Sequence, residues 1–140
     1  MPHVVATVPG QPVPQPRPRV TTRGGFGRAY VPATHPIHAW REAVRQAYDG
    51  PQFGNAVSVH LEFCFRRPPS HLKRNDELTA AGRKQPYPKP DVDNLAKAVL
   101  DALNGVAWVD DSQVVELRTA KSWIDGDAHC IVSVFSGENE

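Results

Sequence analysis

Five prolines stand among residues 9–19, and this stretch limits the fold more than any other part of the chain. Proline fixes φ and has no backbone N–H to donate, so the stretch can be neither a helix nor a central strand. We expect an extended arm, which the glycine-rich residues 21–28 continue as a flexible loop. Regular structure must therefore come from the rest of the chain.

Four segments outside this arm have the alternating or apolar pattern of β-strands: residues 3–8, 57–65, 113–123 and 129–135. A 3.6-residue repeat of apolar positions predicts two helices, one over residues 34–48 with Thr34 as its cap and one after residue 93. These elements predict an α+β fold, in which a small mixed or antiparallel sheet of about four strands packs with two main helices. At 140 residues, we expect a single domain over residues 1–140.

The second predicted helix carries unusual chemistry at its start. Pro90 favours an extended backbone at Lys89, and Asp93 is a favourable N-cap. Asn104-Gly105 ends the helix, because glycine tolerates the positive φ of a C-terminal cap. Apolar residues lie between these limits at helical spacing: Leu95, Val99, Ala102 and Leu103. One face of this helix is therefore expected to pack on the core.

The opposite face of the same helix is charged. Lys97 lies four residues after Asp93 and four before Asp101, so all three lie along one side. Asp91 precedes the cap and can lean over the same end. After a tight turn, residues 106–108 lead back toward the helix. The sequence thus gathers five carboxylates around one helix: Asp91, Asp93, Asp101, Asp110 and Asp111.

Carboxylates drawn together need a counter-charge, which can be shared protons, basic side chains or a divalent cation. Oxygen ligands alone favour a hard ion, Mg²⁺ or Mn²⁺, over zinc. The alternative is that Asp93 only caps the helix, that Lys97 and Asp101 form a surface ion pair, and that residues 110–111 are a polar turn. For the set taken together, a metal site is the better interpretation.

A formal net charge of +1 hides an uneven distribution. Residues 1–45 carry six basic and one acidic side chain, residues 66–89 carry seven and two, and residues 90–140 carry three and ten. Basic flanks around an acidic centre suit an enzyme that acts on a polyanion, although solvated loops are the alternative. We expect residues 9–33 and 66–89 to be mobile basic loops that contact DNA through Arg17, Arg19, Arg23, Arg28, Lys73, Arg74 and Lys89.

The acidic segment also carries a family resemblance. Pro90-Asp91-Val-Asp93-Asn94-Leu-x-Lys97, then Asp101, then Trp-x-Asp-Asp-x-Gln-Val over residues 108–114, strongly resembles the RusA family of Holliday-junction resolvases. The match is dense through residues 90–121. The stretch at residues 10–19, Gly-x-Pro-x-x-x-x-Arg-Pro-Arg, is similar to the family's opening, so the resemblance spans most of the chain.

The resemblance implies that Asp91, Asp93 and Asp111 are metal-binding catalytic carboxylates and that Lys97 is a catalytic or phosphate-contacting lysine. It further implies an Mg²⁺-dependent endodeoxyribonuclease, with Mn²⁺ able to substitute, that acts in DNA recombination and repair. The enzyme would be a homodimer that resolves four-way DNA junctions by paired symmetric nicks. We expect three residues in supporting roles: Asn94 orienting a carboxylate, Asp101 pairing with the lysine, and Asp110 hydrogen-bonding its own loop.

Two other functions stay open at this point: a nuclease of other branched or flapped DNA, and a non-catalytic DNA-binding module whose acidic cluster serves folding. No apolar run is long enough for a membrane span, and no secretory signal is evident. Cys64 and Cys130 lie in strand-like segments and are expected to be buried free thiols. Together these features predict a cytoplasmic protein.

Overall fold

The computed structural model describes residues 3–22, 25, 27–68 and 87–137. Its helical segments are α1 (Pro36–Ala47), α3 (Val92–Leu103) and the short 3-10 turn η3 (Asp111–Gln113). The strands are β1 (His3–Pro9), β2 (Arg19–Thr21), β3 (Arg28–Tyr30), β4 (Val57–Arg66), β5 (Val114–Ile124) and β6 (His129–Ser136).

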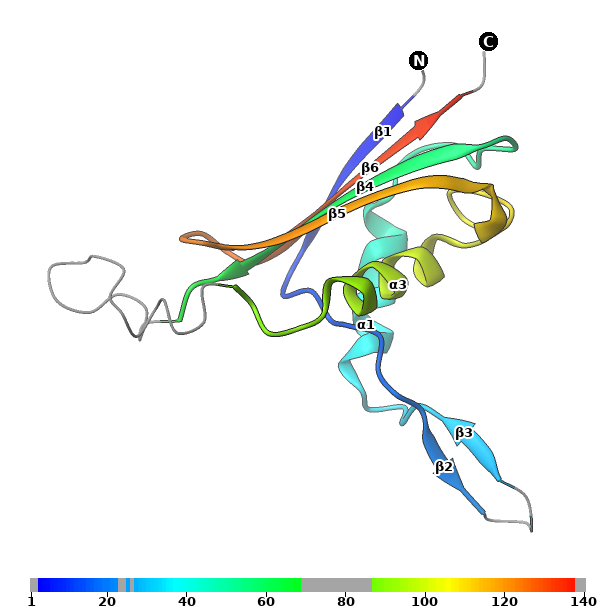
Figure 1. Cartoon of the computed structure of the whole chain (residues 1–140), viewed down its shortest axis with the longest axis vertical. Helices are drawn as coiled ribbons and strands as arrows, with labels where there is room; N and C mark the ends of the chain where they lie inside the picture. Colours follow the sequence, from blue (N-terminus) through cyan, green and yellow to red (C-terminus); the bar gives the residue numbers. More distant parts are fainter. Residues whose placement is uncertain (1–2, 23–24, 26, 69–86, 138–140) are drawn as a thin grey trace, which may run out of the picture.

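Four strands form one mixed sheet in the order β1-β6-β4-β5. β6 is antiparallel to both of its neighbours, whereas β4 and β5 are parallel. Two parallel strands cannot be joined by a tight turn, so the chain crosses over between them, and α3 lies in that crossover. Both helices cover the same face of the sheet (Figure 1). The predicted α+β class, with four strands, two helices and a mixed sheet, is confirmed.

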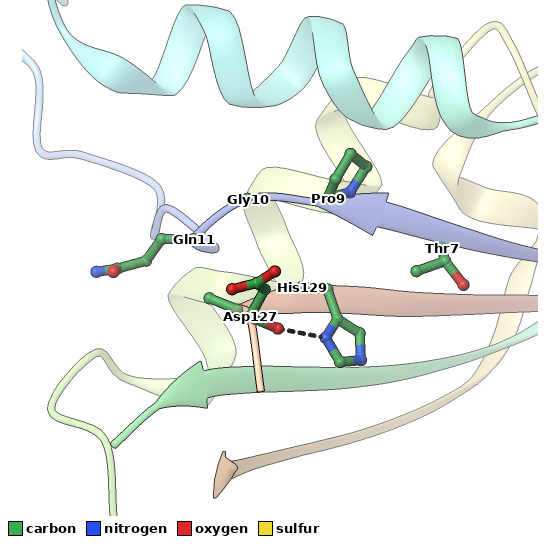
Figure 2. A pocket seen from close by; sticks show the side chains of 7 residues that line it. Thr7, Pro9, Gly10, Gln11, Asp127 and His129 are labelled. Atoms are coloured by element: carbon green, nitrogen blue, oxygen red, sulfur yellow. Dashed lines mark hydrogen bonds between the residues drawn. The ribbon is translucent and has the colours of Figure 1, made fainter. Parts of the chain in front are cut away.

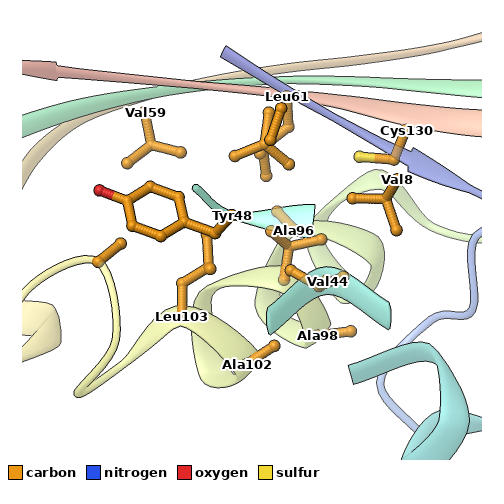
Figure 3. Packing of buried hydrophobic residues seen from close by; sticks show 14 of the residues in the cluster. Val8, Val44, Tyr48, Val59, Leu61, Ala96, Ala98, Ala102, Leu103 and Cys130 are labelled. Atoms are coloured by element: carbon orange, nitrogen blue, oxygen red, sulfur yellow. The ribbon is translucent and has the colours of Figure 1, made fainter. Parts of the chain in front are cut away.

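The core lies between this face of the sheet and the two helices. α3 contributes small side chains as well as large ones, and Figure 3 shows Ala96, Ala98 and Ala102 among the packed groups. Small residues let the helix lie close to α1 and to the sheet. Large side chains that are fully buried fill the remaining space: Trp108, Phe63, Ile37, Leu61, Leu95 and Leu103. Each of these contributes roughly 1.5–3 kcal/mol through burial, which fixes α3 and its charged face in place.

Both predicted helix caps are wrong. α1 begins at Pro36, and its N-cap is His35 rather than Thr34, with the His35 Nδ1 accepting a hydrogen bond from the Ile37 N–H at 3.0 Å. The residue before a proline is held extended and a proline suits the first helical position, so Pro36 sets this boundary. α3 begins at Val92 with Asp91, not Asp93, as its N-cap.

Asp93 instead lies in the first turn of α3. Its Oδ1 accepts a hydrogen bond from the Asn94 N–H at 2.9 Å. A carboxylate in the first turn is favoured by the partial positive charge of the helix N-terminus. At the other end, the predicted stop is confirmed: Asn104 is the C-cap, and Gly105 has a φ of 79°.

The segment over residues 9–33 is not a loop throughout. β2 and β3 pair as an antiparallel hairpin, Arg19 opposite Tyr30 and Thr21 opposite Arg28. The hairpin extends away from the main sheet (Figure 1). Strands of three residues are too short to give a recognisable alternation, which is why the sequence pattern missed them. Most of the second predicted basic loop, residues 66–89, lies outside the described residues.

Cys64 and Cys130 are free and buried, as predicted. Burial raises the pKa of both thiols, most strongly that of Cys130. Among the described residues, no helix has both the length and the apolar content to cross a membrane.

Candidate active site beside α3

A pocket of about 250 Å³ lies between α3, η3 and β5. Its polar lining is Asp93, Lys97 and Asp101 of α3, Asp111 of η3 and Thr119 of β5, and its apolar lining is Val92, Ala96, Leu100 and Leu117. The spacing of four residues along α3 places its three charged side chains on one side of the helix, as the sequence predicted. Four of the predicted site residues therefore border one pocket.

Asp111 is held by a core residue. The indole Nε1 of Trp108 donates a hydrogen bond to Asp111 Oδ1 at 2.7 Å. Trp108 has no exposed surface, so the core fixes the direction from which this proton is donated. A buried indole N–H needs an acceptor, and a hydrogen bond to a carboxylate is among the stronger kinds. No role is predicted for Trp108 from the sequence, although its spacing of three residues from Asp111 is a signal.

The loop that carries Asp111 is tied down by Gln113. The Gln113 Oε1 accepts hydrogen bonds from the backbone N–H groups of Val109 (2.8 Å) and Asp110 (2.9 Å). Its Nε2 donates to the carbonyls of Phe53 (2.9 Å) and Asn55 (2.8 Å), which precede β4. A single amide thus joins the loop to the body of the protein, a role that is not predicted from the sequence.

Asp110 faces its own loop. Its Oδ2 accepts a hydrogen bond from the Ser112 N–H at 3.0 Å, which together with Gln113 forms a capping box at η3. Hydrogen bonds from the Ser112 side chain and backbone lower the pKa of Asp110. The internal hydrogen bond expected of Asp110 is therefore present, and this carboxylate is not among the residues described as lining the pocket.

A chain of charges crosses from α3 to α1. The Lys97 Nζ lies 3.6 Å from Asp101 Oδ1, and the Arg41 Nη2 of α1 lies 3.7 Å from Asp101 Oδ2. Arg41 also donates to the Gln15 Oε1 at 2.5 Å. The predicted pair of Lys97 and Asp101 is present, but Asp101 is shared with Arg41, which no local spacing connects to it. Lys97 keeps 61 % of its side chain exposed.

The proline-rich arm is fixed to the same helix. The Gln15 backbone N–H donates to the carbonyl of Asn94 at 2.9 Å, in the first turn of α3. Gln15 therefore contacts both the helix that carries Asp93 and the arginine that pairs with Asp101. Arg17, which is exposed, therefore follows two residues after Gln15, the point where the arm is bound to α3.

Asp91 stands apart from the other acidic residues. It is exposed, and within the described part of the chain its side chain makes no capping hydrogen bond and does not line the pocket. Across residues 3–22, 25, 27–68 and 87–137, no three His, Cys, Asp or Glu side chains are grouped closely enough to hold a metal ion. The structure does not assemble the predicted triad of Asp91, Asp93 and Asp111 into one ligand set.

The carboxylate oxygens at this site are nevertheless the type of ligand that magnesium prefers. Mg²⁺ keeps several waters and is usually bound by one or two carboxylates together with substrate phosphates, rather than by a complete protein cage. Asp93 and Asp111 supply two carboxylates to one pocket. Asp91, with no cap contact to break, is two residues from Asp93. Asp93 and Asp111 are therefore donors of the kind that a hard cation requires, with water and phosphate to complete its ligands.

Lys121 positions the segment that leads into α3. Its Nζ donates to the carbonyls of Pro88 and Pro90, each at 2.8 Å, and lies 5.2 Å from the centre of the Tyr87 ring. Three contacts from β5 thereby hold the residues just before Asp91. No role is predicted for Lys121 from the sequence. Prolines on both sides of Lys89 were the available signal, because they favour an extended backbone there.

The predicted DNA-contacting residues are only partly described. Arg17 and Lys89 are exposed. The side chains of Arg19 and Arg28, and the whole of residues 23, 73 and 74, lie outside the description, so their contacts stay predictions.

A larger hollow of about 580 Å³ lies elsewhere, between the ends of β1 and β6 (Figure 2). Its lining includes Pro9, Gly10 and His129, and the His129 Nδ1 is hydrogen-bonded to the Asp127 carbonyl at 2.9 Å. The Gly10 N–H also donates to the Ala128 carbonyl. Polar groups here therefore hydrogen-bond to one another at the ends of β1 and β6. The smaller pocket beside α3, with its three carboxylates and a lysine, is the better candidate site.

Comparison with known proteins identifies a family and a relative. The sequence pattern of a family described as "Endodeoxyribonuclease RusA" matches residues 9–134, a range that includes the arm, both helices and every residue of the pocket beside α3. The "Uncharacterized protein YqaN" of Bacillus subtilis (strain 168) is 36% identical over 119 residues, which cover 82% of this chain and 84% of that protein.

Proposed function

The chain belongs to the RusA endodeoxyribonuclease family, and from this membership we propose that it is an Mg²⁺-dependent enzyme that resolves four-way DNA junctions by paired, symmetric nicks. Family membership supports the coarser statement that the protein is an endonuclease of Holliday junctions. The observation that carries the finer proposal is the pocket in which Asp93, Lys97 and Asp111 meet.

In this proposal Asp93, Asp111 and Asp91 hold the metal. When bound, Mg²⁺ would supply activation of water and stabilisation of the charge that develops on the phosphate. Mn²⁺, which accepts the same oxygen ligands, would substitute. The hydrogen bond from Trp108 engages one oxygen of Asp111, and the proposal assigns the other oxygen to the metal. Asn94, exposed beside Asp93, is proposed to orient a carboxylate.

Lys97 is proposed to contact the scissile phosphate. Phosphoryl transfer depends mainly on positioning and on electrostatic stabilisation, so a cation at the phosphate is a direct contribution. The Lys97 ammonium is largely exposed, and its carboxylate partner Asp101 is shared with Arg41. Because Asp101 also pairs with Arg41, its attraction for Lys97 is weaker, and the Lys97 ammonium is able to move to a substrate oxygen.

The remaining parts of the proposal concern the DNA and the assembly. Arg17 lies two residues from Gln15, which is bound to α3, so a phosphate held by the arm is near the site. A four-way junction is nearly two-fold symmetric, and two matched nicks need two matched sites. A C2 homodimer supplies them. A cytoplasmic location belongs to the same proposal.

The test is cleavage of a labelled four-way junction by the purified protein, with Mg²⁺ and with chelator. Asp91→Asn, Asp93→Asn and Asp111→Asn should each reduce cleavage by at least about 100-fold, since even outer-sphere partners of a metal cost 10–100-fold. Junction binding should be kept or tightened, because removing a negative charge lowers repulsion of phosphate. The exposed Asp49, outside the pocket, provides the control variant Asp49→Asn, which should cut as the wild type does.

The substrate panel separates the alternatives. Symmetric nicks in four-way junctions support the proposal. Equal nicking of flaps and forks would point instead to a nuclease of other branched DNA, and retention of junctions without cutting to a DNA-binding module. Wild-type cleavage by all three aspartate variants would refute the assignment of the site.

A further inference from the structure

A further pocket of about 380 Å³, called the second pocket below, lies beside the segment that leads into α3. Phe65 and Arg66 line it from the end of β4, Trp123 from the end of β5, and Lys89 and Pro90 from the segment before α3. β4 and β5 are parallel with Phe65 opposite Trp123, so both rings emerge at the same edge of the sheet. Their centroids are 6.4 Å apart at 77°, an edge-to-face contact that fixes the indole.

This second pocket adjoins the candidate active site. Pro90 lines the second pocket and Val92 lines the first. Two residues of extended chain span at most about 7 Å, so the two pockets are neighbours and Asp91 lies between them. Figure 1 shows the end of β4 beside the chain segment that leads into α3. Lys121, through its contacts with Pro88 and Pro90, fixes the segment that leads from the second pocket to the first.

The chemistry of the second pocket is cationic and aromatic. Lys89 is exposed. Arg66 keeps 68 % of its side chain exposed, and its partner Asp127, at 3.5 Å, is 99 % exposed, so water and salt screen that pair. Among the described residues, the lining contains no carboxylate. The flat indole of Trp123 is partly exposed beside these cations.

A cationic groove next to an aromatic face is what an unpaired nucleotide requires: the base stacks on the ring and the phosphate meets the cation. The volume falls within the range of about 300–1,000 Å³ that small-molecule sites occupy. Extruding a base costs least where its stacking is already interrupted, and the branch point of a junction is such a place.

We propose that the second pocket holds an unpaired nucleotide next to the cleaved phosphate, with its base on Trp123 and its phosphate on Lys89 and Arg66. This inference rests on the proposed function, because it takes Asp91 and Asp93 to mark the cleaved phosphate. It assigns part of the recognition of the branch point to the carboxyl ends of β4 and β5, outside the acidic site.

The experiment uses four-way junctions with 2-aminopurine at each nucleotide that flanks the crossover, in chelator so that the DNA stays intact. Wild-type protein should quench the emission of the base that enters the pocket. Trp123→Leu should abolish that quenching and weaken junction binding by about 5- to 150-fold, the effect of losing one stacked base. Trp123→Phe should restore part of both.

The indole can be followed directly as well. Trp40 and Trp108 are buried, so a change in tryptophan emission on binding DNA reports on Trp123. Trp123 also packs partly on the core, so its replacement can disturb the fold. Lys89→Gln and Arg66→Gln test the same pocket and leave the core intact. Each should reduce the slope of log K against log salt by about one unit. The matched control is Arg45→Gln, a half-exposed arginine of α1 outside both pockets, which should leave the quenching unchanged.

The outcomes separate the two proposals. If the wild type cuts junctions but 2-aminopurine emission is the same with and without Trp123, and if neither charge variant alters binding, the second pocket is not a nucleotide site and this inference fails alone. If the base is quenched through Trp123 but junctions are never cut, the nuclease proposal fails while the nucleotide site stands.

Discussion

Replacing Gln113 with alanine removes the side chain that ties the loop of Asp111 to the body of the protein. Four hydrogen bonds of 2.8–2.9 Å are lost, two accepted and two donated. A protein hydrogen bond contributes about 1 kcal/mol net, and water can reach part of this site after truncation, so we expect a loss of about 2–3 kcal/mol. For a chain of this size, about 3–4 °C per kcal/mol gives a fall in Tm of roughly 6–12 °C.

Thermal unfolding followed by circular dichroism measures this change, and junction cleavage measured on the same preparations tests its consequence. Because the loop positions Asp111 in the pocket, Gln113→Ala should reduce kcat more than it reduces junction affinity. Gln46→Ala is the control. Gln46 is an exposed glutamine of α1 whose amide donates one bond to Glu42, and its removal should stay within about 0.5 kcal/mol. A fall in Tm below about 2 °C, with cleavage at the wild-type rate, would refute the reasoning, since the Trp108 contact would then suffice.

Arg41→Met should reduce the single-turnover cleavage rate more than the junction affinity, because Asp101 then pairs with its lysine alone; equal losses in both would argue against this role. Lys121→Met deprives two carbonyls of a charged donor and should destabilise the fold by about 1.5–3 kcal/mol in urea unfolding, and a change under 0.5 kcal/mol would contradict it. Hydrogen bonds from Ser112 hold the pKa of Asp110 in the folded protein below its ordinary value of 3.8. The ionised carboxylate therefore stabilises the fold at pH values above 3.8, and this stabilisation is lost as the pH falls through the lower pKa of the folded state. The decline of Tm below pH 4 should therefore be smaller in Asp110→Asn than in the wild type, and parallel curves would exclude the effect.

Features that depend on local chain geometry were predictable from the sequence. The apolar face of α3 and the alternation along β4 follow from the 3.6- and 2-residue periods of helix and strand. The predicted apolar face of α3, made of Leu95, Val99, Ala102 and Leu103, is buried. The caps were less predictable, because several residues near each helix start can cap it. At α1, Pro36 decided between Thr34 and His35. The β2–β3 hairpin was missed because each of its strands is only three residues long.

The sequence by itself determined that Asp93, Lys97 and Asp101 share one side of a helix, because residues four apart in an α-helix are neighbours whatever surrounds them. Only the tertiary structure decided what meets them there. The parallel pairing of β4 with β5 brings Asp111 to α3, and the buried indole of Trp108 donates a hydrogen bond to the Asp111 carboxylate. The packing of α1 on α3 brings Arg41 to Asp101. These contacts join residues that are distant in sequence or fixed by the core, so no local period encodes them, and they exist only once the apolar faces have packed.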